Sequence, residues 1–282
     1  AAACAALIFA AGQAPARGKD SAMLEKEASA VIGEYLAKYE PLDLNLREAW
    51  FRYNTTGDKK DSDREAEIIL EIRKLDSDRD RFARLKELFR ERKNISDPLL
   101  RRQVEVLYLS HLPNQVSSDK LMRLTELEKR LGEKFNDYAP VVGGKKLSLV
   151  EISHILSDST DSRKLEEAWK AQHLVAPLLE ADYRELVKLR NAIARDLGYK
   201  NALALSAEVA ETDLEMLDRF YADVTKATEK PFRKLKEEYI DPRLAARYGV
   251  AVADLRPWHY QNAFFQEAPT AILGDVDLDS LY

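Results

Sequence analysis

The sequence predicts an all-α fold with one small β-hairpin. Apolar residues recur every three or four positions through most of the chain after Lys19, the spacing that places them on one helix face. Prolines and glycines stand mainly at the boundaries of these periodic segments, where they begin or end helices. One Gly-Gly pair separates two short runs, of which the first is β-branched, and this pattern is typical of a hairpin turn.

The first half of the chain predicts a series of amphipathic helices. They span residues 21–39, 44–53, 61–93, 98–112 and 119–135. We expect Pro41 to end the first, because proline cannot donate the backbone hydrogen bond that a helix interior requires. Gly57 closes the second, and Asp76-Ser-Asp78 is a candidate break within the charge-dense third. Pro98 stands where a helix would begin.

The second half opens with the hairpin and returns to helices. Residues 138–148 carry Gly143-Gly144 as the turn. The expected helices span residues 149–156, 162–198 and 213–248. Pro177 predicts a kink or a fresh start, and Pro231 predicts an interruption. Gly198 and Gly249 occupy positions where a C-cap glycine belongs.

Composition bounds the domain organisation and the partners. With 282 residues and 45% hydrophobic content, the chain can bury a sizeable core in one or two domains. Acidic and basic residues are interleaved and the formal net charge is -5, so we expect no nucleic-acid partner, which would need a concentrated basic face. There is no internal repeat or low-complexity linker. The sequence therefore predicts that residues 17–282 form one helical unit or the first lobe of a larger one.

Residues 1–16 do not read as part of the fold. An apolar run over residues 1–11, too short to span a membrane, precedes the small-residue site Ala14-Pro-Ala16. This resembles the back half of a secretory signal peptide, so we expect an exported protein, secreted or periplasmic. No other window is apolar enough to cross a bilayer. Cys4, the sole cysteine, lies inside the segment, so a cleaved form would have no disulfide.

An aromatic block near the C-terminal end suggests either core or pocket. Over residues 254–269 it combines apolar rings with polar tips and two prolines. The rings belong to Trp258, Tyr260, Phe264 and Phe265. Apolar area of this size is normally buried or binds a partner, and irregular aromatic-rich backbone is typical of pocket walls. The sequence leaves both interpretations open.

Among the four histidines, His259 is the best candidate ligand or acid–base group, against a hydrogen-bonded structural role. Glu151 and His154 lie three residues apart on one helix face, but a di-iron bundle needs two such pairs, and we favour structural roles for His111 and His173. The sequence contains no Gly-x-Ser-x-Gly, no phosphate-loop glycine pattern and no His-Glu-x-x-His.

Several motifs, taken in order, resemble one family. They are Glu-Ala-Trp-Phe-Arg-Tyr-Asn-Thr-Thr-Gly over residues 48–57, Leu-Glu-Glu-Ala-Trp over 165–169 with a following His173, Asp-Leu-Gly-Tyr over 196–199, and Leu-Arg-Pro-Trp-His-Tyr-Gln over 255–261. This series resembles the angiotensin-converting-enzyme family of zinc peptidyl-dipeptidases, and the last motif resembles its bacterial branch. The resemblance runs from about residue 24 to the end of the sequence.

The resemblance implies a mostly helical, two-lobed peptidase with a central channel, of which the charged N-terminal helices would form the lid. It implies peptide substrates cut near the C-terminus and zinc in the complete protein, held by a His-Glu-x-x-His helix. The resemblance places that motif after Tyr282, so we expect residues 17–282 to be an incomplete N-terminal portion, inactive alone. It assigns no catalytic residue or metal ligand here.

The resemblance also suggests which residues contact the peptide. These substrate-binding candidates share the last motif and are Trp258, His259, Tyr260 and Gln261. The family's chloride-binding arginine has no clear counterpart around residues 202–206, so chloride dependence is not carried over. The rival interpretation is a non-catalytic helical module that binds peptides without cutting them.

Overall fold

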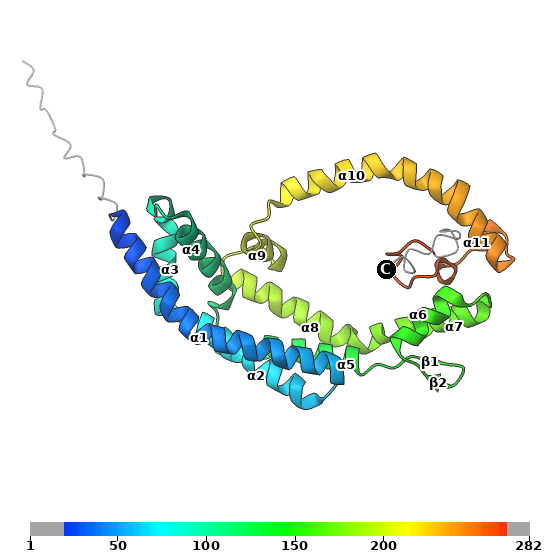
Figure 1. Ribbon diagram of the computed structural model, residues 1–282, viewed down its shortest axis with the longest axis horizontal. Coiled ribbons are helices and arrows are strands. Elements are labelled where there is room, and N and C mark those ends of the chain that lie inside the picture. The colour runs from blue at the N-terminus through cyan, green and yellow to red at the C-terminus, as the bar shows by residue number, and fades with distance from the viewer. Residues whose placement is uncertain (1–19, 270–282) are drawn as a thin grey trace, which may run out of the picture.

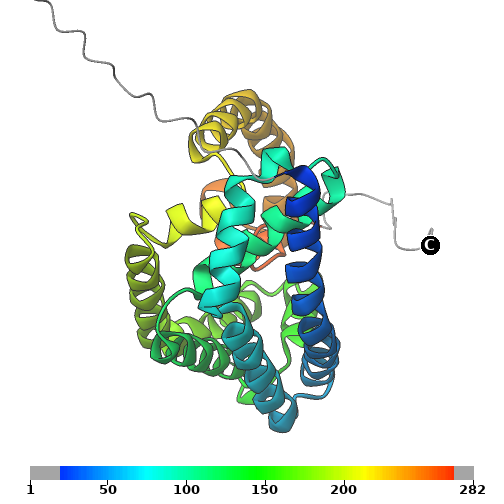
Figure 2. The same cartoon turned by 90° about the vertical axis from the view of Figure 1, so that its left-hand side faces the viewer.

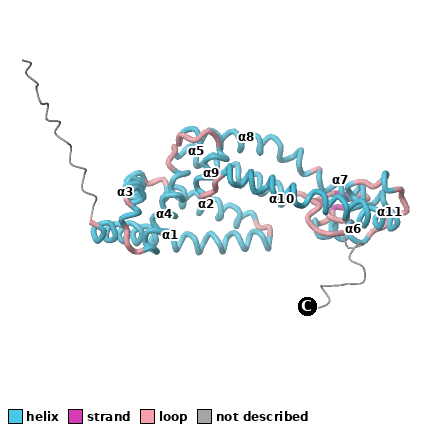
Figure 3. Tube along the Cα trace, turned by 90° about the horizontal axis from the view of Figure 1, so that it is seen from above, coloured by secondary structure: helices cyan, strands magenta, loops and turns pink. Residues whose placement is uncertain are grey.

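The computed structural model describes residues 20–269. Two groups of helices lie at opposite ends of an elongated molecule, and α8 and α10 run between them (Figure 1; Figure 3). The N-terminal group contains α1 to α5 with α9, and the C-terminal group contains α6, α7 and α11. The predicted fold class, all-α with one small hairpin, is confirmed. The predicted leader, residues 1–16, lies outside the described residues.

The N-terminal group is built from long helices packed side by side (Figure 2). Its members are α1 (Ser21–Thr56), α2 (Lys59–Asp76), α3 (Arg79–Arg90), α4 (Pro98–His111) and α5 (Ser118–Asn136), with short 3₁₀ turns at Arg92–Asn94 and Leu112–Asn114. Aspartates before the first four helices accept hydrogen bonds from backbone N–H groups of the first turn, which replaces bonds the helix itself cannot make. The predicted break at Asp76-Ser-Asp78 is confirmed.

The expected end of the first helix at Pro41 is wrong. α1 continues through Pro41 and includes the segment predicted as a separate second helix, residues 44–53. An internal proline costs about 3 kcal/mol. Burial on both sides offsets this cost, since Leu24 and Val31 pack in a core with α3 and α4 before the proline, while Ala49 and Tyr53 are buried after it. Tertiary packing therefore overrides the local signal.

A buried polar junction ties these helices together at Asp76. Tyr35 Oη donates to Asp76 Oδ1 over 3.0 Å, and Asn114 Nδ2 donates to Oδ2 over 3.4 Å. Burial raises the pKa of Asp76 to about 6 and lowers the pKa of His111 to about 4. His111 is fully buried and neutral at pH 7, and its ring lies 4.8 Å from that of Tyr35. Its predicted structural role agrees with this packing.

The predicted hairpin is confirmed. β1 (Val141–Val142) pairs antiparallel with β2 (Lys145–Lys146), with Val142 opposite Lys145. Gly143 and Gly144 both have positive φ, 58° and 78°, which is the requirement of the two-residue turn that matches the twist of antiparallel strands.

The connecting and C-terminal helices are α6 (Leu149–Asp158), α7 (Ser162–His173), α8 (Val175–Asp196), α9 (Ala202–Val209), α10 (Leu214–Leu235) and α11 (Asp241–Tyr248). Pro177 lies in the first turn of α8, so the fresh start is the correct alternative. Helix α9, which the sequence prediction did not single out, begins where the Asn201 side chain accepts from Ala204 N. Gly198 and Gly249 follow helices with φ of 88° and 61°, as expected of C-terminal glycines.

The expected interruption at Pro231 is wrong by five residues. α10 passes through Pro231 and changes to a π-helical turn at Lys236–Ile240 before α11 begins. Two 3₁₀ turns, Val252–Asp254 and Pro257–Tyr260, follow α11. The chain thereby returns under the arc of α10 to the helices of the C-terminal group (Figure 1).

The C-terminal group has its own hydrophobic core. The core joins the hairpin, α6, α7 and the turn into α11, and its buried members are Val142, Ile152, Leu156, Leu165, Ala168, Ala171, Ile240, Leu244 and Tyr248. Trp258 and Tyr260 pack against it from the aromatic block. The core is therefore the support on which the predicted peptide contacts rest.

We expect Leu244→Ala to lower the free energy of unfolding by about 2–5 kcal/mol, because Leu244 is fully buried in this core and its removal leaves a cavity. Leu203→Ala is the control, since Leu203 is 63% exposed. Urea unfolding of both variants tests this. Equal midpoints for the two would contradict the assignment of the core.

Candidate functional site

The candidate site is the aromatic block where it returns under α10. The 3₁₀ turn Pro257–Tyr260 contacts α7 and α11. It places the four predicted peptide contacts on one short stretch of backbone, but their side chains enter different environments. His259 and Gln261 are buried, whereas Trp258 and Tyr260 are partly exposed.

His259 is held from both sides of its ring. Its Nδ1 accepts from the Arg256 backbone N–H over 2.9 Å, so the ring proton is on Nε2, which donates to Ser162 Oγ over 2.8 Å. The ring is 1% exposed and stacks on Tyr248 at 4.8 Å. Burial, with the nearby Arg256 charge, lowers the pKa of His259. Both nitrogens are therefore occupied, and this geometry supports the structural role over the ligand or acid–base role.

Ser162 connects the aromatic block to α7. Its Oγ accepts from His259 Nε2 and also from the Trp258 indole Nε1, the latter over 3.3 Å. Gln261 adds a second connection to the preceding helix, since its Nε2 donates to Ser157 O over 2.6 Å. Gln261 has φ of 63°, a left-handed conformation that costs a residue with a Cβ about 1 kcal/mol. These hydrogen bonds hold the turn in that conformation.

Tyr260 belongs to a ring of three hydrogen bonds. Its hydroxyl donates to Asp241 Oδ1 over 2.9 Å and accepts from Lys236 Nζ over 2.9 Å, and Lys236 Nζ also donates to Asp241 Oδ2 over 2.6 Å. Burial raises the pKa of Tyr260, which keeps the hydroxyl protonated. Burial opposes the charge on Lys236, but its bonds to Asp241 and Tyr260 outweigh burial and raise its pKa. The ring fixes the π-helical turn against the aromatic block.

Tyr260 and Lys236 also line an apolar cavity of about 550 Å³ between α10 and the aromatic block. Most of the other lining side chains are apolar. The apolar ones are Phe232, Leu235, Ile240, Leu255, Pro257, Phe265, Ala268 and Pro269. A volume of this size lies within the range of roughly 300–1,000 Å³ typical of ligand pockets. The cavity can therefore admit an apolar side chain with Tyr260 and Lys236 as polar partners beside it.

The sequence prediction missed the half of this cavity contributed by α10 and the π-helical turn. Phe232 and Lys236 precede Tyr260 by more than twenty residues, and no motif in the sequence connects them with it. The only trace of it in the sequence is the recurrence of apolar residues along α10, among them Phe232 and Leu235, and their exposure became visible only in the structure. The aromatic block thus contributes to both the core and a cavity, which the sequence left as alternatives.

A second cavity, of about 660 Å³, lies among α1, α2, α5, α8 and α9. Its apolar lining includes Leu46, Ile72 and Leu205. Arg73 and Arg190 supply cations at its wall, and both pair with Glu128, at 2.6 and 2.7 Å. The cavity is formed by helices from both halves of the described chain, so its shape depends on their packing.

The remaining histidine candidates lie in different environments. Glu151 accepts from Ser148 N over 2.7 Å in a reciprocal helix cap, whereas His154 is exposed on α6 with its Nδ1 3.9 Å from Asp158 Oδ2. His173 Nδ1 bonds Trp169 O over 2.7 Å, and the two rings lie 4.0 Å apart.

A comparison with protein-family models shows which family the chain belongs to. The family model described as angiotensin-converting enzyme, a peptidase family M2 model, matches residues 22–257, most of the chain. The chain belongs to this family. No curated protein matches it. The bacterial branch suggested by the last motif stays a prediction.

Membership of a metallopeptidase family raises the question of a metal. Among residues 20–269, no group of three or more His, Cys, Asp or Glu side chains could hold a metal ion. His259 has both ring nitrogens in hydrogen bonds and does not fit a ligand role. The described residues therefore do not fit zinc.

Among residues 20–269, no helix is long and apolar enough to span a membrane.

We expect Ser162→Ala to lower the free energy of unfolding by about 1–3 kcal/mol, since it leaves the His259 and Trp258 donors without their shared acceptor. Ser29→Ala is the control, because the Ser29 hydroxyl bonds Glu25 O on an exposed helix face. Chemical unfolding followed by fluorescence measures both. Similar losses in the two variants would contradict the anchoring role.

The lowered pKa of His259 predicts a pH-dependent contribution to stability. The folded state binds fewer protons at this residue than the unfolded state, so stability falls as pH drops below the unfolded pKa of about 6.5. We expect His259→Gln to cost less stability at about pH 5 than at about pH 7.5. Denaturation at the two pH values tests this, and a pH-independent cost would refute it. His111 and Asp76 are common to both proteins, so their titration cancels.

Proposed function

We propose that this chain supplies part of the peptide-binding surface of a zinc-dependent peptidyl-dipeptidase that hydrolyses short peptides near the C-terminus. Family membership over residues 22–257 is the observation that carries the proposal. The metal ligands and the general base would come from residues outside those described. In this proposal the charged helices α1 to α3 form the lid, and the protein is exported.

The cavity beside Tyr260 supports a peptide ligand. Its mostly apolar lining suits a hydrophobic side chain, and Lys236 and Tyr260 are among its polar lining residues, with Arg256, Gln266 and Glu267. Tyr260 is the predicted contact that the geometry favours most, because it lines the cavity. Trp258 is partly exposed and suits the same role. His259 and Gln261 would support the turn from behind, through Ser162 and Ser157.

A non-catalytic peptide-binding module is the second candidate. The apolar cavity beside Tyr260 favours it, because this feature supports peptide binding and needs no catalytic residue. The candidates differ in whether the complete gene product hydrolyses peptides in a chelator-sensitive manner. Chelator-sensitive release of dipeptides supports the peptidase, and saturable binding without hydrolysis supports the module.

We expect Phe265→Ala to weaken binding of a fluorescent hydrophobic peptide by about tenfold, because Phe265 lines the cavity. Phe264→Ala is a matched control, since Phe264 is its neighbour, is similarly exposed and does not line the cavity. Fluorescence anisotropy on the chain measures both affinities. Equal affinities for the two variants would place the peptide elsewhere.

The same chain, assayed with added zinc and a quenched dipeptide-releasing substrate, is expected to show no turnover. The reason is that the described residues hold no group able to bind the metal. Turnover abolished by a chelator would contradict the proposed placement of the catalytic residues. Peptide binding without turnover would agree with it.

A further inference from the structure

Asp76 and His111 face each other in the N-terminal group without a hydrogen bond between them. His111, at the end of α4, is fully buried, and its Nε2 has no hydrogen-bond partner among residues 20–269. This nitrogen lies 3.9 Å from Oδ1 of Asp76, the last residue of α2, which is 6% exposed. The distance exceeds that of a hydrogen bond, so the interaction depends on which of the two atoms carries a proton.

The neighbours of His111 decide which of its ring nitrogens carries the proton. The Ser110 hydroxyl donates its only hydrogen to Leu107 O over 3.0 Å, so its Oγ is an acceptor for His111 Nδ1, which lies 3.3 Å away. Nδ1 therefore holds the proton of the neutral ring. Nε2 is left as an acceptor that points at no donor.

The Asp76 carboxylate is an acceptor as well. Its Oδ1 accepts from the Tyr35 hydroxyl and its Oδ2 from the Asn114 amide, and an ionised carboxylate has no hydrogen to donate. In the ionised state of Asp76, two buried acceptors therefore face each other across 3.9 Å with no hydrogen between them. Such an arrangement is unfavourable away from water, and one added proton would satisfy both atoms.

Other charged groups act on this pair less strongly than burial does. Burial raises the pKa of Asp76 to about 6 and lowers the pKa of His111 to about 4, although Arg81 lowers the pKa of both and Asp78 raises that of His111. Asp76 therefore takes up a proton before His111 does. The charged or titratable side chains that face the pair from the packed helices and the nearby cavity wall are Tyr35, Tyr39, Arg73, Asp78, Arg81 and Arg190. The arginines of the cavity wall, Arg73 and Arg190, both pair with Glu128.

The cavity of about 660 Å³ gives a proton access to Asp76. Asp76 and Asn114 belong to its lining, whereas His111 does not. The Asp76 side chain keeps 9% of its surface exposed, and that of His111 keeps none. The carboxylate can therefore exchange a proton through the cavity while the imidazole stays enclosed.

We propose that Asp76 and His111 form a pH-sensitive contact that joins α2 to α4 when the carboxylate takes up a proton. The proton comes from solvent and binds Oδ1, which then donates to His111 Nε2 and still accepts from Tyr35. The distance between Oδ1 and Nε2 shortens by about 1 Å to that of a hydrogen bond. Acidification thus ties α1, α2 and α4 together at one buried point. This inference concerns the fold and does not rest on the proposed peptidase function.

The direct test follows the ring nitrogens of His111 by NMR in the chain labelled with ¹⁵N-histidine, between about pH 8 and pH 5. The His111 signals are those absent from His111→Gln. We expect the Nδ1–H tautomer throughout, and a shift of the Nε2 signal with its midpoint near pH 6 and no protonation of the ring. An Nε2–H tautomer at pH 8, a static Nε2 signal, or a ring that gains its own proton near pH 6 would each overturn the proposal.

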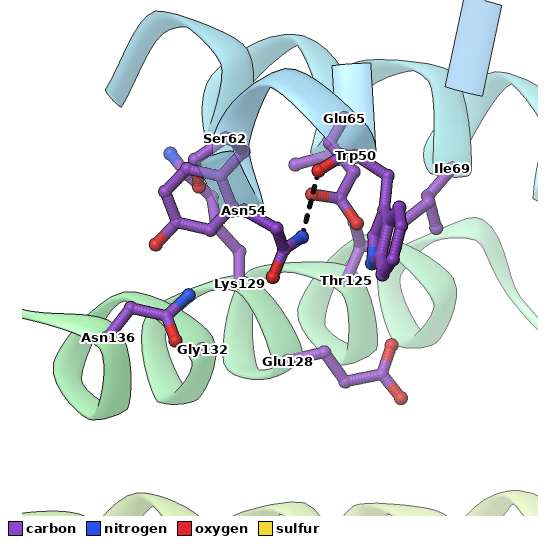
Figure 4. A pocket seen from close by; sticks show the side chains of 12 residues that line it. Trp50, Asn54, Ser62, Glu65, Ile69, Thr125, Glu128, Lys129, Gly132 and Asn136 are labelled. Carbon is purple, nitrogen blue, oxygen red and sulfur yellow. Dashed lines mark hydrogen bonds between the residues drawn. The ribbon is translucent and has the colours of Figure 1, made fainter. Parts of the chain in front are cut away.

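Asp76→Asn imitates the protonated carboxyl group, because an amide N–H can donate to Nε2 at every pH. We expect the shifted Nε2 signal already at about pH 8 in this variant, without a further change to pH 5. Glu65→Gln is the matched control, since Glu65 is also a carboxylate on α2 whose pKa burial raises. Glu65 lines a separate cavity of about 220 Å³ between α1, α2 and α5, and no histidine is among the described residues around it (Figure 4). This control should keep the wild-type titration of His111, and a wild-type titration in Asp76→Asn would contradict the inference.

Stability gives an independent measurement. Because the pKa of Asp76 is higher in the folded than in the unfolded chain, the folded state binds more protons there between about pH 4 and pH 6. The contribution of Asp76 to stability therefore grows as the pH falls through 6. Asp76→Asn lacks this titration, and His111 is common to both proteins. We expect the ratio of their unfolding constants to change about tenfold in favour of the wild type between about pH 7.5 and pH 5, and a constant ratio would overturn the proposal.

Discussion

The attachment of the aromatic block to α7 and α11 is the interaction on which the C-terminal half depends. α10 has no buried residue along its length, so it contributes little packing of its own. Two sets of hydrogen bonds hold the aromatic block, which follows α10 and α11 in the chain, against the C-terminal group. Ser162 accepts from Trp258 and His259, and Asp241 binds Lys236 and Tyr260. Because these groups are buried or partly buried, their bonds are shielded from water and define one position for the turn.

This attachment explains why residues predicted as peptide contacts divide into two kinds. The side chains that hold the turn are buried, and the side chain that reaches the cavity, Tyr260, is itself fixed by Lys236 and Asp241. A binding surface needs such support, since contacts that shift on binding lose affinity to the cost of ordering them. The same residues therefore belong to the core on one side and to a cavity on the other.

Both groups of helices contain buried polar atoms without a hydrogen-bond partner among residues 20–269, and in the C-terminal group they include Trp169 Nε1 and Tyr248 Oη. The polar side chains of the aromatic block differ, since His259, Tyr260 and Gln261 are all hydrogen-bonded within the chain. Because an unpaired buried polar atom costs stability, this pairing stabilises the block in one position.

The sequence by itself determined the all-α class, most helix boundaries, the Gly143-Gly144 turn and the family, because periodicity, caps and turn glycines act over a few residues. Tertiary structure decided the rest. Helices α1 and α10 pass through Pro41 and Pro231, because packing or anchoring elsewhere along the chain outweighs a local penalty. The partners of His259 and Tyr260 lie 97 and 24 residues away, at Ser162 and Lys236. No local pattern encodes such distances, so only the folded chain shows which rings support the turn and which line a cavity.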